Sequence, residues 1–445
     1  MNIHIERIFN SSRQFQIFFL LLLIFRSFIQ LQSVHLKSTN NNNNNNCPHL
    51  LKTLSNCTCV RSNTIDCSYS TTLIHLPRSW ISTNHNLTIF TQSITRFNLS
   101  SLPSFTFIKT NDFQGLTNLR HLLIINTGLI TIQPHAFRHL YHLYELRIEL
   151  NQKLTEIKTF ALSDIEHIHL LSLKSNSIRI LHTESFRNTH FVDILDLSDN
   201  PLEIIESYAF NGLKSVGTLI LCLSSTCSIK QIDPYAFFGF HTCDRILLTG
   251  LHLSLHSNSF SYMTSIRLVN LSHSDISHIH NYAFQTSEHI GEIDLSSSLI
   301  STIDVHAFDQ LVNVSLLNLQ GNLIRLFEKS IFQSLIYSIK QINLDNNPIQ
   351  CDCTLEWYLE QRSNQFKLPD VCTGPIGYEC LSPTELHKSQ LPCYQTTNQT
   401  KKRNLCERRE KDISVRESSA YLYELNCNLF ILIIFIFTNK ILFLL

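Results

Sequence analysis

Cysteine is the residue type in this sequence with the clearest chemical consequence. Of its 14 cysteines, four lie at 47–67, three at 222–243 and five at 351–393, while Cys406 and Cys427 stand apart. Thiols grouped near the ends of a long chain are typical of disulfide bonding in an oxidising compartment. The alternative is a zinc site at Cys351 and Cys353. It is disfavoured because two to four residues usually separate paired zinc ligands, whereas only one residue separates these cysteines.

Histidine could supply metal binding or pH sensing. Two pairs, His167/His169 and His278/His280, have a spacing that places both rings on one side of an extended segment. With 22 histidines in the chain, surface rings without a role are the more ordinary interpretation. The spacings G-x-G-x-x-G, G-x-x-x-x-G-K, G-x-S-x-G and H-E-x-x-H are absent from the sequence. We therefore expect no enzyme, no cofactor and no bound metal.

The overall composition narrows the class further. The chain has 445 residues, 43% of them hydrophobic, and a formal net charge of zero. It can bury a large core, and it lacks the basic field that would attract nucleic acid.

The N-terminal region predicts export. Arg7 and Arg13 precede the apolar run 17–25, which is the layout of a signal peptide over residues 1–33. A short buried helix is the alternative. Residues 34–46 end in a run of seven asparagines, a low-complexity stretch that we interpret as a spacer.

The C-terminal region predicts an anchor. Residues 395–420 form a polar stalk, and residues 421–445 form a spacer and a hydrophobic tail. The triplet Ser418-Ser419-Ala420, a short spacer and the apolar tail favour a glycolipid-anchor signal. A single transmembrane helix is the alternative, although the tail from Leu429 reaches only about 25 Å.

A sequence repeat occupies the part of the chain between the N-terminal and C-terminal regions, and it must position the cysteines and histidines that lie there. Aromatic residues recur mostly every 24 positions, with Leu162 filling one slot: Phe113, Phe137, Phe186, Phe210, Phe237, Phe260, Phe284, Phe308 and Phe332. Before each comes the pattern L-x-x-L-x-L-x-x-N-x-L, seen most clearly as Val192, Leu195, Leu197, Asn200 and Leu202. Alternating leucines make a short strand with one buried face, and stacked units share a continuous core.

The pattern over 87–349 resembles the extracellular leucine-rich repeat family, similar to Toll-like and Slit-like ectodomains. This resemblance implies an α/β fold: a curved horseshoe solenoid with about 10–12 repeats over 81–348 and short parallel strands on its concave face. A buried asparagine in each repeat should satisfy backbone groups of neighbouring turns. These are Asn151, Asn176, Asn200, Asn322 and Asn347, with Thr127, Ser224, Ser274 and Ser298 as shorter substitutes. Leu251 cannot form these bonds, so we expect an irregular turn after Cys243.

The resemblance also implies disulfide-bonded caps. Residues 47–80 match the N-terminal cap, with Cys47–Cys59 and Cys57–Cys67 as the implied pairs. Residues 349–394 match the C-terminal cap, which opens with N-P-I-Q-C-D-C-T-L-E-W from Asn347. Here the implied pairs are Cys351–Cys372 and Cys353–Cys393, and Cys380 is surplus. The sequence alone permits other pairings.

Two cysteines bracket a three-residue insertion in the middle of the repeats. We expect a local disulfide between Cys222 and Cys227, which would leave Cys243 as a buried thiol. A Cys227–Cys243 bond is the alternative.

The concave face is the expected binding surface. Its candidate ligand-binding residues are Tyr144, Glu145, Arg147, Glu149, Lys174, Asp193, Asp196 and Asp199. We expect Asp193, Asp196 and Asp199 to converge within one turn, where they would hold a cation or meet a basic partner; a merely solvated strand face is the favoured interpretation. Six N-x-S/T sequons after the expected signal peptide predict glycosylation at Asn56, Asn86, Asn98, Asn270, Asn313 and Asn398. A sugar on Asn270 would fill part of the concave face.

These features predict an extracellular recognition protein. It would bind a protein ligand in cell-surface recognition, adhesion or receptor assembly, either anchored outside the plasma membrane or secreted, and as a homo- or hetero-oligomer if its partner requires it. The alternative is a secreted protein that binds the extracellular matrix.

Overall fold

The computed structural model describes residues 57–60, 63–70, 72–76, 85–223, 227–332, 335–361, 363–375, 378–379 and 381–394. The chain divides into two units, Met1–Asn45 and Asn46–Leu445, and every described residue belongs to the second. The expected signal peptide, asparagine spacer, stalk and hydrophobic tail lie outside the described residues. Within those residues, no helix has the length and apolar character needed to cross a membrane.

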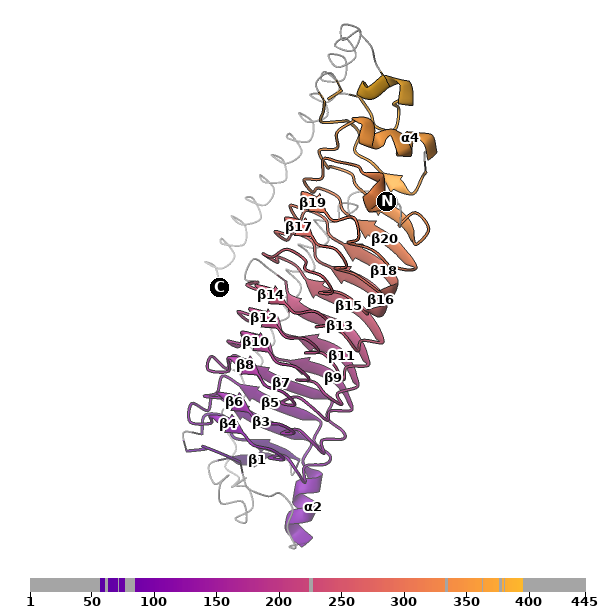
Figure 1. The fold of residues 1–445 in the computed structure, drawn as a ribbon. Helices are drawn as coiled ribbons and strands as arrows, with labels where there is room; N and C mark the ends of the chain where they lie inside the picture. Colours follow the sequence, from indigo (N-terminus) through magenta and orange to yellow (C-terminus); the bar gives the residue numbers. More distant parts are fainter. Residues whose placement is uncertain are drawn as a thin grey trace, which may run out of the picture. The chain divides into compact units, whose positions relative to one another are not determined.

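The described part of the second unit is a solenoid built on one large sheet (Figure 1). Neighbours in the sheet follow chain order and pair in parallel, except for the antiparallel pair β1–β2. Its strands are β1 (Thr58–Val60), β2 (Thr64–Asp66), β3 (Arg96–Ser100), β5 (His121–Ile125), β7 (Glu145–Glu149), β9 (His167–Ser172), β11 (Phe191–Asp196), β13 (Ser215–Cys222), β15 (Thr242–Leu248), β16 (Thr264–Asn270), β18 (Glu288–Asp294), β20 (Val314–Asn318), β21 (Ile339–Asn343) and β22 (Phe366–Lys367). This confirms the predicted parallel-strand solenoid.

Short strands form a second set of ladders on the other side of the core (Figure 1). They are β4 (Phe107–Ile108) with β6 (Thr131–Ile132); β8 (Glu156–Ile157), β10 (Ile180–Leu181), β12 (Ile204–Ile205) and β14 (Gln231–Ile232); and β17 (His278–Ile279) with β19 (Thr302–Ile303). We call these the outer ladders. In the described part of the chain, helices are few and short: α2 (His85–Ser93), α3 (Lys329–Phe332), α4 (Glu356–Gln361) and the 3-10 turns η2 (Cys353–Leu355), η3 (Lys388–Gln390) and η4 (Pro392–Tyr394).

The alternating sequence explains the layering. In β7, Leu146 and Ile148 are fully buried, while the alternate residues Glu145, Arg147 and Glu149 are partly exposed on the opposite face. Successive strands repeat this arrangement in register, so Leu122 pairs with Leu146 and Leu146 with Leu171. Burial of each such apolar side chain stabilises the fold by about 1.5–3 kcal/mol. A single turn cannot bury these side chains alone, because the neighbouring turns cover them.

The recurring phenylalanines form a buried column on the far side of these leucines. Phe113 stacks on Phe137 with ring centroids 5.6 Å apart. After the interruption at Leu162, the column runs from Phe186 through Phe210, Phe237, Phe260 and Phe284 to Phe308, with successive centroids 5.0–5.8 Å apart. The 24-residue period therefore places one aromatic ring on top of the next.

The asparagine slots satisfy the backbone between turns. Asn200 is 4% exposed; its amide nitrogen donates to the carbonyls of Leu173 and Leu197, and its oxygen accepts from the Ile178 amide. The other four slot asparagines are equally buried and make corresponding bonds. The residue before each slot has left-handed backbone, as at Asp199 with φ 57°. Asp and Asn tolerate this conformation better than most residues other than glycine.

The turn after Cys243 departs from the repeat, in agreement with the lack of an asparagine at Leu251. The four-stranded outer ladder ends at β14, and only an isolated bridge, Leu255 to Ile279, joins this turn to β17. The pairing of β13 with β15 also shifts register beyond Ile220. Fully buried Leu251 fills the slot as an apolar residue, and its amide donates instead to Ser274 Oγ in the next turn.

Disulfides lie at both ends of the repeats. Cys57 is bonded to Cys67, and the C-terminal pairs are Cys351–Cys372 and Cys353–Cys393, the same pairs that the resemblance implied. Cys59 is also disulfide-bonded, whereas Cys47, Cys380, Cys406 and Cys427 lie outside the described residues.

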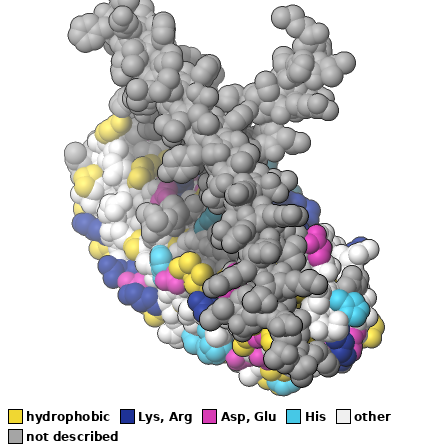
Figure 2. All heavy atoms as spheres, turned by 90° about the horizontal axis from the view of Figure 1, so that it is seen from above, with side chains coloured by type: hydrophobic (Ala, Val, Ile, Leu, Met, Phe, Trp, Pro, Cys, Tyr) yellow, Lys and Arg dark blue, Asp and Glu magenta, His cyan; other side chains and the backbone are white. Residues whose placement is uncertain are grey.

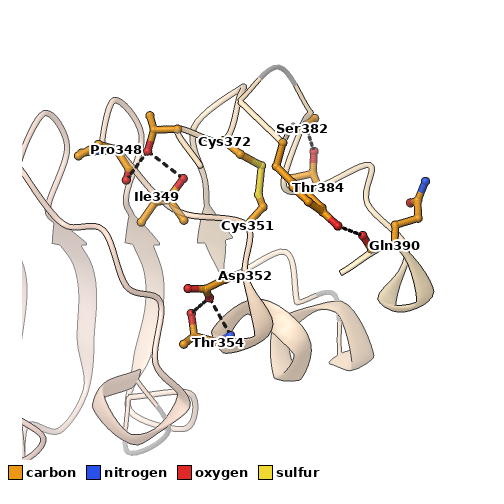
Figure 3. Close-up of a disulfide and its surroundings, with 11 residues drawn as sticks. Pro348, Ile349, Cys351, Asp352, Thr354, Cys372, Ser382, Thr384 and Gln390 are labelled. Atoms are coloured by element: carbon orange, nitrogen blue, oxygen red, sulfur yellow. Dashed lines mark hydrogen bonds between the residues drawn. A yellow bond between two sulfur atoms is a disulfide. The ribbon is translucent and has the colours of Figure 1, made fainter. Parts of the chain in front are cut away.

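The last turn is covered by the C-terminal cap. Beside Cys351, the Asp352 carboxylate accepts from the Thr354 amide and hydroxyl at 2.9 and 2.6 Å, which starts η2 (Figure 3). Trp357 on α4 is buried and donates its indole N–H to the Phe327 carbonyl at 2.9 Å. The sheet ends in two short edge strands, β22 at this end and β1 of the hairpin β1–β2 at the other. Such short edges offer few unpaired backbone groups to other chains.

Candidate functional site

The solvent side of the large sheet carries the candidate binding residues that lie in strands, and we call it the strand face; they are Glu145, Arg147, Glu149, Asp193 and Asp196. It is the side that the repeat pattern assigns to the concave surface. Parallel pairing aligns its residues in rows across the sheet, so His121 lies beside Glu145, and Glu145 beside Leu170. Figure 2, seen from above the view of Figure 1, shows acidic, basic and histidine side chains interspersed among the described residues that are visible there.

A charge cluster occupies the strand face over β5, β7 and β9. It consists of His121, Glu145, Arg147, Glu149 and Ser172. Glu145 contacts His121 Nδ1 at 2.9 Å and Arg147 Nε at 2.5 Å. Glu149 contacts Arg147 at 3.3 Å and accepts from Ser172 Oγ at 2.5 Å. The guanidinium is thus held between two carboxylates from its own strand.

This pairing shifts the acid–base equilibria of the cluster. Burial acts to raise the pKa of Glu145, but its bonds to His121 and Arg147 outweigh burial and lower it. Burial also acts against the charge of Arg147, but Glu145 and Glu149 raise its pKa above the ordinary value. Both groups therefore remain charged at neutral pH, and together they present a fixed pattern of charge.

Tyr144 lies directly before β7 and is 51% exposed. Its ring stacks on His169 at 4.7 Å and meets His121 edge-on at 6.0 Å. His169 in turn contacts Asp193 at 2.8 Å. The large exposed ring is thereby held in place beside the charge cluster.

The three aspartates do not converge, so this expectation was wrong. Asp193 contacts His169, Asp196 accepts from the Ser198 amide at 2.9 Å, and Asp199 contacts Lys174 at 3.4 Å. They occupy different rows because Asp193 and Asp196 sit at different strand positions and Asp199 belongs to the turn. The described residues contain a single His/Cys/Asp/Glu group compact enough for a metal ion, and it lies elsewhere.

Sequence reasoning missed an apolar patch on the strand face. Leu170, Ile194, Ile220 and Leu247 are half-buried residues on four adjacent strands, β9, β11, β13 and β15. Leu170 pairs with Ile194 in one row and Ile220 pairs with Leu247 in the next, because Ile194 itself pairs with Thr218 and Ile220 with Asp196. A signal was present, because each stands next to a core leucine as Leu-Leu or Ile-Leu where most repeats have a polar residue. We name these four residues the apolar patch.

Later turns present amide and acid groups instead. Asn318 donates to Asp294 at 3.0 Å, and Asn343 donates to Asn318 at 3.0 Å. Asn270 belongs to the same row, between Leu247 and Asp294, and its oxygen accepts from the Ser272 amide at 3.0 Å.

The other sequons differ in accessibility. Asn98 donates to Asp66 at 3.1 Å on the strand face, whereas Asn313 is exposed immediately before β20. The side chain of Asn86, and the whole of Asn56 and Asn398, lie outside the described residues.

Cys222 and Cys227 lie at the two ends of the three-residue insertion, where the sequence predicted a local disulfide. Cys222 and Cys227 form a disulfide. Cys243 is a buried thiol that donates to the Arg245 carbonyl at 3.4 Å. Burial raises the pKa of Cys243 to about 12, so the thiol is neutral at physiological pH.

A separate group of titratable side chains lies on the outer ladders. His278 and His280 flank the buried Ile279 of β17, and Asp304 follows the paired strand β19. His256 stacks on His280 at 5.0 Å. Partial burial, together with the rings of His278 and His256, lowers the pKa of His280. The strand face and this group occupy opposite sides of the core.

Models of leucine-rich repeats match most of the central part of the chain. The BspA type leucine rich repeat region matches residues 106–243 in six copies, and a second leucine rich repeat model matches residues 264–324. The CD180 antigen of mouse is 25% identical over 335 residues, which are 64% of this chain and 42% of that protein. The chain therefore spans less than half the length of this relative.

Three solved structures are also similar. A complex of Latrophilin 3, Unc5D and FLRT2 contains a chain with a TM-score of 0.47 and 21% identity, covering 78% of this chain and 100% of that one. The mouse RP105/MD-1 complex gives a TM-score of 0.36 and 21% identity, with coverage of 66% and 46%. Human 5T4 gives a TM-score of 0.36 and 16% identity, with coverage of 56% and 95%.

Proposed function

We propose that this chain, a leucine-rich repeat solenoid with disulfides at both ends, is an extracellular recognition protein that binds a protein partner through its strand face. Its place would be the outer side of the plasma membrane or the surrounding medium. The fold itself does not select a ligand, so the proposal depends on the side chains that the strand face presents.

The observation that carries the proposal is the apolar patch beside the charge cluster. The patch crosses four adjacent strands, a width of roughly 14 Å at the usual strand spacing. Protein interfaces typically have an apolar centre depleted of charge, surrounded by a polar rim. Here Glu145 of the charge cluster pairs with Leu170 at one end of the patch, and Arg245 lies at the other end on the same strand as Leu247.

Preorganisation supports the same conclusion. The ring of Tyr144 and the guanidinium of Arg147 are already held by neighbours, so a partner would immobilise few additional rotamers. Tyr and Arg are also the residue types most often found at the energetic centres of interfaces. We therefore propose that the partner contacts turns β5 to β15 and not the amide row of β18 to β21.

An unbiased binding screen tests this function. The purified full-length chain is presented to a library of extracellular and cell-surface proteins, and each partner found is titrated against variants. Tyr144→Ala with Arg147→Ala should weaken binding by at least about 30-fold, as removal of one interface residue worth roughly 2 kcal/mol would do. Ile194→Ser with Ile220→Ser tests the patch in the same way.

A matched control changes the same residue types away from the strand face. Tyr262 and Arg179 are both exposed, and Tyr262→Ala with Arg179→Ala should leave affinity unchanged. Equal loss in the two double variants would refute the proposed surface. So would binding that survives the Tyr144/Arg147 change but is lost on Arg267→Ala. Capture only of matrix polymers such as collagen or glycosaminoglycan would favour the alternative, a secreted matrix-binding protein.

A further inference from the structure

The outer ladders bring two histidines and one carboxylate together from consecutive turns. Because Ile279 of β17 points into the core, His278 and His280 both project outward. β17 pairs with β19 in parallel, His278 beside Thr302 and Ile279 beside Ile303, which places Asp304 beside His280. The grouping depends on both turns and is not visible in the linear sequence.

The three side chains are close enough to share one ion. His278 Nε2 lies 2.7 Å from one Asp304 oxygen, and His280 Nδ1 lies 3.8 Å from the other. One ligand atom from each residue can be chosen so that all three lie within 4.8 Å of one another. The side chains are 30–36% exposed, so an ion can reach them from solvent.

We propose that His278, His280 and Asp304 form a zinc-binding site, with water completing the coordination. Two imidazoles and a carboxylate are a donor set that Zn²⁺ accepts readily, whereas Ca²⁺ and Mg²⁺ prefer oxygen alone. Zinc bonds of 2.0–2.2 Å in tetrahedral geometry place neighbouring ligand atoms about 3.3 Å apart. The 2.7 Å and 3.8 Å distances join the two histidines to different Asp304 oxygens, and the three chosen ligand atoms, all within 4.8 Å of one another, draw closer together when the ion binds.

Neighbouring groups already orient the ligands. The Asn281 amide donates to the second oxygen of Asp304 at 3.0 Å, which fixes the plane of the carboxylate. His256 stacks on one side of His280, and the ring of His278 lies 4.1 Å away from His280. The two ligand rings are nearly parallel, at 18°, and tilt toward the ion when it binds. Outer-shell contacts of this kind are a regular feature of metal sites.

His182, another histidine on the outer ladders, shows by comparison why His278, His280 and Asp304 can share one ion. His182 also follows a short strand, but its two ring nitrogens contact carboxylates of the preceding and following turns, Glu156 at 3.0 Å and Glu206 at 2.9 Å. The carboxylates lie on opposite sides of the ring, so no three ligand atoms converge. His182 is therefore a matched control: it is also a histidine on the outer ladders beside carboxylates, but it belongs to no group of three converging ligands.

Titration with zinc tests the site directly. The full-length chain, produced without a histidine tag and stripped with a chelator, is titrated with ZnCl2 by calorimetry and, in parallel, with Co²⁺ by visible absorption. We expect one strong site per chain and the intense absorption of tetrahedral cobalt. His278→Ala with His280→Ala should remove this site, a loss greater than the roughly 10–100-fold caused by outer-shell changes. His182→Ala should retain it.

Asp304→Asn gives a second, gentler variant, since an amide oxygen can still accept from Asn281. It should weaken zinc binding without unfolding the chain, and zinc should raise the melting temperature of the wild type more than that of this variant. CaCl2 should not raise it. Equal zinc affinity in the wild type, the double histidine variant and Asp304→Asn would overturn the proposal, as would equal loss in His182→Ala.

Discussion

Replacing Asn200 by leucine should destabilise the solenoid through two specific backbone groups. Leucine has nearly the size and branching of asparagine, so packing is little changed while all hydrogen bonding is lost. The Ile178 amide and the Leu197 carbonyl both bond to the Asn200 side chain at 3.1 and 2.9 Å. The Leu173 carbonyl keeps a donor because Asn176 also bonds to it at 2.6 Å.

The magnitude follows from counting the groups left without a partner. Each buried polar group without its hydrogen bond costs about 1–3 kcal/mol, so Asn200→Leu should cost roughly 2–6 kcal/mol. Thr127→Leu is the matched comparison at a slot with a shorter side chain. There the Leu129 amide loses its bond to Thr127 Oγ1, while the Thr127 amide keeps Asn151. One group is affected, and the expected cost is about 1–3 kcal/mol.

Urea unfolding of the two full-length variants measures the difference, and hydrogen exchange locates it. A solenoid can unfold in parts, so exchange of the amide of Ile178 is the more specific readout. This amide should lose protection in Asn200→Leu and keep it in Thr127→Leu. Equal destabilisation of the two variants, or an Ile178 amide that stays protected in Asn200→Leu, would refute the assigned role of the slot.

Three further predictions concern other parts of the solenoid. Because the Cys243 thiol is buried with a pKa of about 12, iodoacetamide at pH 8 should label it only after denaturation. Non-reducing peptide mapping should show no disulfide between Cys243 and Cys227. Rapid labelling of the native chain would contradict this prediction. Mass spectrometry of the mature protein should find glycans on Asn270 and Asn313, and a bare Asn270 would contradict the expectation that a sugar fills part of the concave face. The lowered pKa of Glu145 stabilises the folded state fully above its ordinary value of 4.5, and this contribution is lost as pH falls through the lower, folded-state pKa. Glu145→Gln should therefore lose less stability than the wild type between about pH 5 and pH 3, and identical acid unfolding profiles would count against the pairing.

Much of the fold could be read from the sequence because the repeat is a local rule applied many times. The alternation around Leu195 and Leu197 defines a strand, the phenylalanine period defines the turn, and Asn200 marks the bond between turns. Parallel stacking follows because no turn can bury its apolar face alone. The sequence did not indicate α2, since the segment at 85–93 lacks the leucine pattern on which the reasoning depended.

The binding surface depended on facts that a repeat pattern does not contain. The sequence identified which residues leave the core, including Tyr144 and Arg147, because strand alternation assigns each side chain to a face. It could not show that Leu170 pairs with Ile194 and Ile220 with Leu247 in neighbouring rows, because those pairings depend on the register between turns. The same limit explains why three aspartates close in sequence point to different partners.

What the sequence determined by itself is the repeat, the two cysteine-rich ends and the face on which each residue lies, since these follow from chemistry within about 24 residues. What only the tertiary structure decided is which residues from different turns meet. His280 and Asp304 are 24 positions apart and come side by side because β17 and β19 pair in parallel. Parallel pairing brings together residues one full turn apart, so a site that spans two turns exists only once the turns have stacked.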